Sequence, residues 1–265
     1  MTTKTKPTSP PFSILPVVTR RPVFLTARWQ ALAMINFAVD PQLLQPLVPR
    51  GTELDFYAGK AYVSVVGFLF RQTKLLGCSV PWHIDFEEVN LRFYVRHSPG
   101  HEVRRGVCFV RELVPRRAIA AVARWCYNES FLALPMRSNV DLAAITADQQ
   151  TSEQHHLAYD WKSSSGWCGL QVRTIGSKQL PAAGSLEEFI AEHYWGYCRQ
   201  RDGGTIEYEV QHTPWSVWQA EQLPWLGDVP RYYGESWAQA LSGQASSVFV
   251  ADGSAVQVFR PTRIN

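Results

Sequence analysis

Cysteine is scarce in this chain of 265 residues. The five that occur lie far apart, are odd in number and form no Cys-x-x-Cys pair: Cys78, Cys108, Cys126, Cys168 and Cys198. Disulfide frameworks and structural zinc sites need paired or closely spaced cysteines, so we expect neither. The sequence predicts reduced thiols that are mostly buried.

Long apolar runs are also missing. The longest, such as residues 61–70, are far too short to span a bilayer as a helix. Residues 1–11 are rich in Thr, Ser, Pro and Lys and contain no apolar core of the kind a signal peptide needs. We therefore predict a cytoplasmic protein without a membrane partner. Residues 1–18 are expected to form a flexible tail, and residues 19–265 a single domain.

Several signatures of partner and cofactor binding are absent. Basic residues do not alternate with aromatic ones as they do in grooves that bind single-stranded DNA or RNA, so nucleic acid is not an expected partner. The chain contains no Gly-x-Ser-x-Gly elbow, phosphate-binding loop or Gly-x-Gly-x-x-Gly turn, and no cofactor is predicted. His155 and His156 are adjacent and would point to opposite faces of a strand, so no metal site is predicted either.

Aromatic residues, in contrast, make up 12% of the chain and hydrophobic residues 46%. They fall into many short stretches rich in β-branched and aromatic side chains, which turn residues separate. These stretches do not alternate with helices, which disfavours a parallel sheet. The sequence therefore predicts an α+β protein that is mainly antiparallel β, built as a barrel or sandwich with two or three flanking helices.

Local signals place the helices and hairpins. Helices are expected over residues 41–47, where Asp40 caps a start at Pro41, over residues 118–126, and from the capping box Ser185 to Glu188 as far as about residue 198. Hairpins are expected to join residues 54–57 to 61–70, 157–162 to 167–174, and 247–251 to 254–259.

The stretch Phe86–Arg96 is the most informative strand. Side chains alternate between the faces of a strand, so one face carries Val89, Leu91, Phe93 and Val95. The other face carries a carboxylate, an amide, a guanidinium and a phenol: Glu88, Asn90, Arg92 and Tyr94. This polar row is either a solvated face with a structural ion-pair ladder or the lining of a polar pocket, and the sequence leaves both open.

If the row lines a pocket, its residues have distinct chemical roles. Arg92 would clamp a carboxylate, with Asn90 and Tyr94 fixing the ligand's orientation. Glu88 would pair with Arg92 and act as a catalytic proton carrier. His212, expected to be at least half buried, is either a second catalytic group that shuttles protons or a core histidine bonded to the backbone.

Arg124 lies on the expected helix 118–126. It is a further candidate for ligand binding, with an ion pair to Glu129 as the structural alternative.

The order of motifs resembles a known family. The segments concerned are Glu53-Leu54-Asp55, Gly59-x-Ala61-Tyr62-Val63-Ser64, Glu88-x-Asn90-x-Arg92-x-Tyr94-Val95, Arg105-Gly106-Val107, Ala123-Arg124-x-x-Tyr127 and Val210-x-His212-x-Pro214-Trp215. Over roughly residues 24–225 they resemble the YqjF-like family of uncharacterised bacterial proteins. That family is considered related in fold to acetoacetate decarboxylase, so the resemblance implies a cone-shaped or partly open β-barrel with a pocket inside.

The resemblance does not carry the decarboxylase mechanism with it. That enzyme forms a Schiff base through a lysine activated by a neighbouring lysine, but residues 123–131, which look like the matching segment, contain none. Only six lysines occur in the chain and no two are adjacent, so such an activated amine is not expected. Phe86-x-Glu88 does resemble the aromatic-x-Glu that points a carboxylate into the decarboxylase pocket.

Three functional hypotheses follow. The first is an enzyme that binds a small organic acid, a carboxylic acid ligand, and acts on it by acid–base chemistry without a Schiff-base lysine. The second is a small-molecule-binding barrel without catalysis, and the third is a purely structural barrel with a filled core. The first two require an internal cavity, and the third does not.

Overall fold

The computed structural model describes residues 21–79, 84–115, 131–147 and 154–264. The predicted tail over residues 1–18 lies outside these described residues. So do Arg124, Cys126 and the helix expected over residues 118–126. The assignment of residues 19–265 to one domain stays a prediction.

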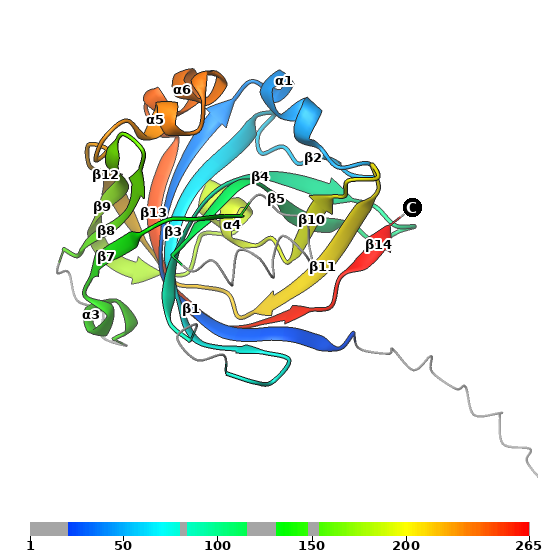
Figure 1. Cartoon of the computed structure of the whole chain (residues 1–265), viewed down its shortest axis with the longest axis horizontal. Helices are drawn as coiled ribbons and strands as arrows, with labels where there is room; N and C mark the ends of the chain where they lie inside the picture. Colours follow the sequence, from blue (N-terminus) through cyan, green and yellow to red (C-terminus); the bar gives the residue numbers. More distant parts are fainter. Residues whose placement is uncertain (1–20, 80–83, 116–130, 148–153, 265) are drawn as a thin grey trace, which may run out of the picture.

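Seven strands form a ring (Figure 1). In spatial order they are β11 (Thr205–His212), β10 (Trp195–Arg199), β5 (Arg104–Val114), β4 (Phe86–His97), β3 (Ala61–Leu75), β1 (Val23–Val39) and β13 (Ser247–Phe259), which pairs again with β11. The pairings are antiparallel except for that of β10 with β5. The ring is only partly closed, because β10 meets β5 through Trp195 and Gly196 alone and β11 meets β13 through residues 210–212.

A second layer covers the outside of the ring. It contains β12 (Val217–Gln222), β9 (Gly166–Gln179), β8 (His156–Ser163) and β7 (Met136–Val140), which continue the sheet beyond β13 (Figure 1). Ile35, Val65 and Leu91 of the ring share a buried core with Tyr159 and Leu170 of this layer. The apolar faces of β1, β3 and β4 therefore point outward, toward the second layer.

The remaining elements are short. Among the described residues they are β2 (Glu53–Leu54), β6 (Phe131–Ala133), β14 (Thr262–Ile264), α1 (Pro41–Leu44), the 3-10 helix η1 (Gln45–Leu47), α3 (Leu142–Thr146), α4 (Leu186–Ala191), α5 (Val229–Tyr232) and α6 (Glu235–Ser242). No helix in these ranges is long and apolar enough to cross a membrane.

The structure confirms the fold class and several of the expected elements. The Asp40 side chain accepts a hydrogen bond from the backbone of Gln42 and so caps α1, as its sequence predicts. The strand expected over residues 86–96 is β4, and the hairpin of β8 and β9 forms around Gly166. Cys108, Cys168 and Cys198 are buried, whereas Cys78 is exposed.

Three expected elements are wrong. The helix capped by Ser185 ends at Ala191, because residues 195–199 pair with β11 as strand β10, whose first two residues also pair with β5. The expected C-terminal hairpin is a single strand, β13, in which Gly253 takes a positive φ of 87° without reversing the chain. The hairpin expected from residue 54 to residue 70 is reduced to one bridge between Tyr57 and Lys60, because β2 pairs with β4.

Candidate functional site

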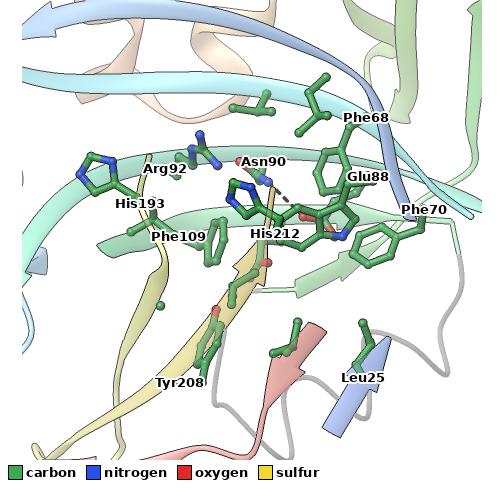
Figure 2. Close-up of a pocket in the computed structure, with 18 of the residues that line it drawn as sticks. Leu25, Phe68, Phe70, Glu88, Asn90, Arg92, Phe109, His193, Tyr208 and His212 are labelled. Carbon is green, nitrogen blue, oxygen red and sulfur yellow. Dashed lines mark hydrogen bonds between the residues drawn. The ribbon is translucent and has the colours of Figure 1, made fainter. Parts of the chain in front are cut away.

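The polar row of β4 faces the inside of the ring. Glu88, Asn90 and Arg92 line a cavity of about 220 Å³, shown in Figure 2. Glu88 is 4% exposed and Asn90 2% exposed, so the row is not a solvated outer face. Both faces of β4 are thus covered, the apolar one by the second layer and the polar one by the far wall of the ring.

The wall around this row is largely aromatic. It receives side chains from every strand of the ring, since alternate residues of each strand point inward. The aromatic members are Phe24, Trp29, Phe68, Phe70, Phe86, Phe109, Phe131, Trp195, Tyr208 and Trp215. Polar groups are concentrated on β4, on Glu112 opposite Asn90 in β5, and on two histidines, His193 and His212.

Asn90 and Glu88 interact within the row. The amide nitrogen of Asn90 donates to Oε1 of Glu88 over 3.0 Å, the contact dashed in Figure 2. The Asn90 amide oxygen is buried and has no hydrogen-bond partner among the described residues. A buried acceptor left without a donor is costly, so this oxygen is suited to a donor on a bound ligand.

Arg92 departs from its expected pairing. Its Nε donates to the Tyr94 hydroxyl over 3.3 Å, and its Nη2 donates to the carbonyl of Ile190 over 3.3 Å. These contacts hold the guanidinium toward the end of α4. The structure describes both Glu88 and Arg92, and the expected ion pair between them does not form. Of the described residues that line the cavity, Arg92 is the one arginine or lysine.

Tyr94 supports Arg92 instead of lining the cavity. Its buried hydroxyl lies 2.6 Å from Oγ of Ser64, which in turn lies 2.6 Å from Oδ1 of Asn36. Arg92 can only donate and an amide oxygen can only accept, so each hydroxyl of this chain donates in the direction of Asn36. The Asn36 amide nitrogen then donates to Oγ of Ser247 on β13 over 2.9 Å.

His212 is placed as the sequence predicts, partly buried on the cavity wall. Its ring stacks on Trp215 with centroids 4.1 Å apart. Its Nδ1 lies 2.9 Å from the carbonyl oxygen of Thr213, which can only accept, so Nδ1 carries the hydrogen and Nε2 has the free lone pair of a neutral imidazole. Burial lowers the pKa of His212 and favours that neutral form.

Sequence reasoning missed Asp55, Glu112 and His193. Nε2 of His193 lies 3.3 Å from Oδ2 of Asp55, although the two residues are 138 positions apart. Nε of Arg105 donates to the same carboxylate oxygen over 2.7 Å. No local spacing signals this arrangement, and the sequence predicts His193 inside a helix that in the structure already ends at Ala191.

No lysine is found among the described residues that line the cavity. Lys60, Lys74 and Lys162 are exposed, and Lys178 donates to the carbonyl of Ala147. The described residues also contain no group of three or more His, Cys, Asp or Glu side chains that could hold a metal ion.

Comparison with known proteins agrees with this architecture. The profile of the DUF2071 family, described as an uncharacterised conserved protein, matches residues 26–255. The chain belongs to this family. A relative is the uncharacterised protein YqjF of Bacillus subtilis (strain 168), 26% identical over 195 residues, which cover 73% of this chain and 74% of YqjF.

Solved structures show the fold. Acetoacetate decarboxylase from Legionella pneumophila is similar with a TM-score of 0.59 at 12% identity, over 95% of this chain and 93% of that one. The enduracididine biosynthesis enzyme MppR, complexed with pyruvate, is similar with a TM-score of 0.60 at 9% identity, over 94% and 93% of the two chains. This member of the DUF2071 family therefore has the acetoacetate decarboxylase-like fold.

Proposed function

We propose that the cavity binds a small organic acid with an apolar body, whose carboxylate pairs with Arg92. The observation that carries this proposal is a guanidinium that faces an apolar, aromatic cavity and has no carboxylate partner among the described residues. A cation in such a place is costly unless an anion joins it, and the planar fork of arginine matches a carboxylate.

The surroundings of Arg92 define the rest of the ligand. The aromatic wall would cover its apolar body, and the free acceptor of Asn90 would bind a donor on it. The complex of MppR with pyruvate supports this ligand class, since a protein of related fold binds a small carboxylic acid. Arg124 stays a candidate ligand residue, and the cytoplasmic location stays a prediction.

Acid–base chemistry on the bound acid is the reaction that these residues support. Glu88 supplies a carboxyl group, and His212 supplies a neutral imidazole whose Nε2 can take a proton. No Schiff base is part of this proposal, because no lysine lines the described wall. The alternative function, binding without catalysis, uses the same cavity and the same Arg92 contact.

A thermal-shift titration with small carboxylic acids tests the binding proposal. Saturation at a hundredfold excess over Kd stabilises the fold by about 2.7 kcal/mol. Arg92→Ala should abolish this ligand-dependent shift, and Arg92→Lys should restore only part of it, because an ammonium cannot copy the planar fork.

Arg96→Ala is the matched control, since Arg96 is an exposed arginine on the same face of β4 that pairs with Glu53. It should keep the full shift. Equal shifts for Arg92→Ala and the parent chain would show that acids do not bind at this site.

A further inference from the structure

We infer that Asp55 and His193 form a dyad that selects hydroxy acids, with Nδ1 of neutral His193 accepting a hydrogen bond from a hydroxyl group of the acid that Arg92 holds. This inference rests on the proposed function and names the substrate class of the same cavity.

The first step of the argument is the position of His193. It follows α4 and lines the cavity, and Figure 2 shows it at the same end as Arg92. The carbonyl of Ile190, three residues earlier, accepts the hydrogen bond of Arg92 and ties the two residues to one segment. A ligand carboxylate on Arg92 would therefore lie close to the imidazole.

The second step is the charge of Asp55. Burial alone would raise its pKa, but hydrogen bonds from His193 and Arg105 outweigh burial and lower the pKa below its ordinary value. Asp55 is therefore ionised and can only accept hydrogen bonds. Its contact with Nε2 of His193 then requires that Nε2 carries the hydrogen.

The third step is the free nitrogen. The His193 side chain is 1% exposed, and its Nδ1 is buried with no hydrogen-bond partner among the described residues. Burial lowers the pKa of His193 to about 4, and the charges of Arg105 and Arg92 act in the same direction against the attraction of Asp55. At neutral pH the ring is thus neutral, and Nδ1 carries a lone pair without a donor.

The described residues packed around the His193 imidazole offer no donor to Nδ1, so a donor has to come from the ligand. Tyr94 and Phe189 contact the imidazole through their rings, at centroid distances of 4.7 and 5.1 Å. The Tyr94 hydroxyl is already bonded to Ser64 and Arg92. An acid with a hydroxyl near its carboxylate would satisfy Nδ1 and Arg92 together, whereas a plain acid would leave Nδ1 without a donor.

Calorimetric titration with mandelate and phenylacetate tests this inference, because the two acids share a phenyl ring and a carboxylate and differ in one hydroxyl. The parent chain should bind mandelate about threefold to tenfold more tightly. His193→Phe keeps an aromatic ring between Tyr94 and Phe189 but has no lone pair, and Arg105 still pairs with Asp55, so this variant should bind the two acids equally.

His97→Gln is the control, because His97 lies at the end of β4 and bonds the Gly51 carbonyl outside the cavity. It should keep the preference for mandelate. A preference that persists in His193→Phe, or a parent chain that binds both acids equally, would overturn the inference but not the proposed function. If neither acid bound the parent chain, the proposed function would fail and the inference with it.

A second measurement needs neither ligand nor variant. Nitrogen-15 spectra of the histidine-labelled parent chain at neutral pH should show His193 neutral, with the hydrogen on Nε2. A hydrogen on Nδ1, or a doubly protonated ring, would overturn the inference.

Discussion

At the scale of single residues, the site is defined by partners that can only accept hydrogen bonds. The Asp55 carboxylate fixes the tautomer of His193, the Thr213 carbonyl fixes that of His212, and the Ile190 carbonyl holds one arm of Arg92. The site thus combines one permanent cation, Arg92, with two neutral imidazoles, His193 and His212, each of which has a lone pair. In the proposed function this arrangement binds an anion, and transfer of a proton from the bound acid to an imidazole leaves the net charge of the complex unchanged.

His193 also predicts how stability depends on pH. Its pKa of about 4 in the folded chain lies below the ordinary value of 6.5, so the unfolded chain takes up a proton first as the pH falls. The stabilisation is present above pH 6.5 and is lost toward pH 4. Unfolding in urea should show a loss of about 2 kcal/mol between about pH 7 and about pH 5 from this group.

His193→Gln should flatten this part of the profile, whereas His156→Gln, which changes an exposed histidine, should leave it as in the parent. An unchanged slope in His193→Gln would mean that His193 has the same pKa in the folded and unfolded chains. The lowered pKa of Asp55 acts with the same sign at lower pH, so the two groups do not cancel.

At the scale of elements, β4 was predictable and the dyad was not. The strict alternation of β4 identified Glu88, Asn90 and Arg92 as one face, and the structure places that face in the cavity. The sequence could not say whether the face was inside, because that depends on strands distant in the chain. Nor could it find His193, whose partner is 138 residues away and whose surroundings depend on where α4 ends.

Gly67 sets how closely β3 approaches the second layer. A Cβ atom at this position would lie 2.6 Å from Cδ2 of Tyr159, whose hydroxyl is anchored on the Ala31 carbonyl. Gly67→Ala should therefore destabilise the fold by about 1–3 kcal/mol in urea unfolding, because β3 and β8 must move apart. Gly243→Ala, with no atom within 4 Å of the added carbon, is the control and should change stability little.

At the scale of the whole molecule, the ring of strands has an apolar core on its outer face and a cavity with polar groups inside. The fold class was predictable from the density of short strands, and the similarity to decarboxylase-like structures confirms it. The single strand β13 was not predictable, because Asp252-Gly253 is a typical turn sequence. Pairing with β1 along nearly its whole length keeps β13 extended through that point.

The cavity as a whole predicts a lysine-independent reaction. Pyruvate in deuterium oxide should exchange its methyl hydrogens faster with the protein than in buffer, since neutral His212 and Glu88 can move protons beside Arg92. Added borohydride should leave no adduct on any lysine by mass spectrometry, because none lines the described wall.

His212→Gln should slow the exchange at least tenfold while the acid still binds. Exchange at the buffer rate in the parent chain, with binding intact, would identify a binding protein without catalysis. A mass increase on Lys60 or Lys162 would contradict the mechanism outright.

Two short strand pairings close the ring and are its weakest points. One joins β10 to β5 at Trp195 and Gly196, beginning two residues after His193, and the other joins β11 to β13 and ends at His212. Ladders of two or three residues open at a lower free energy than the long pairing of β1 with β3. Amide hydrogens in these two short pairings should therefore exchange with solvent faster than those between β1 and β3. A ligand that enters through local opening of either pairing would pass close to His193 or His212.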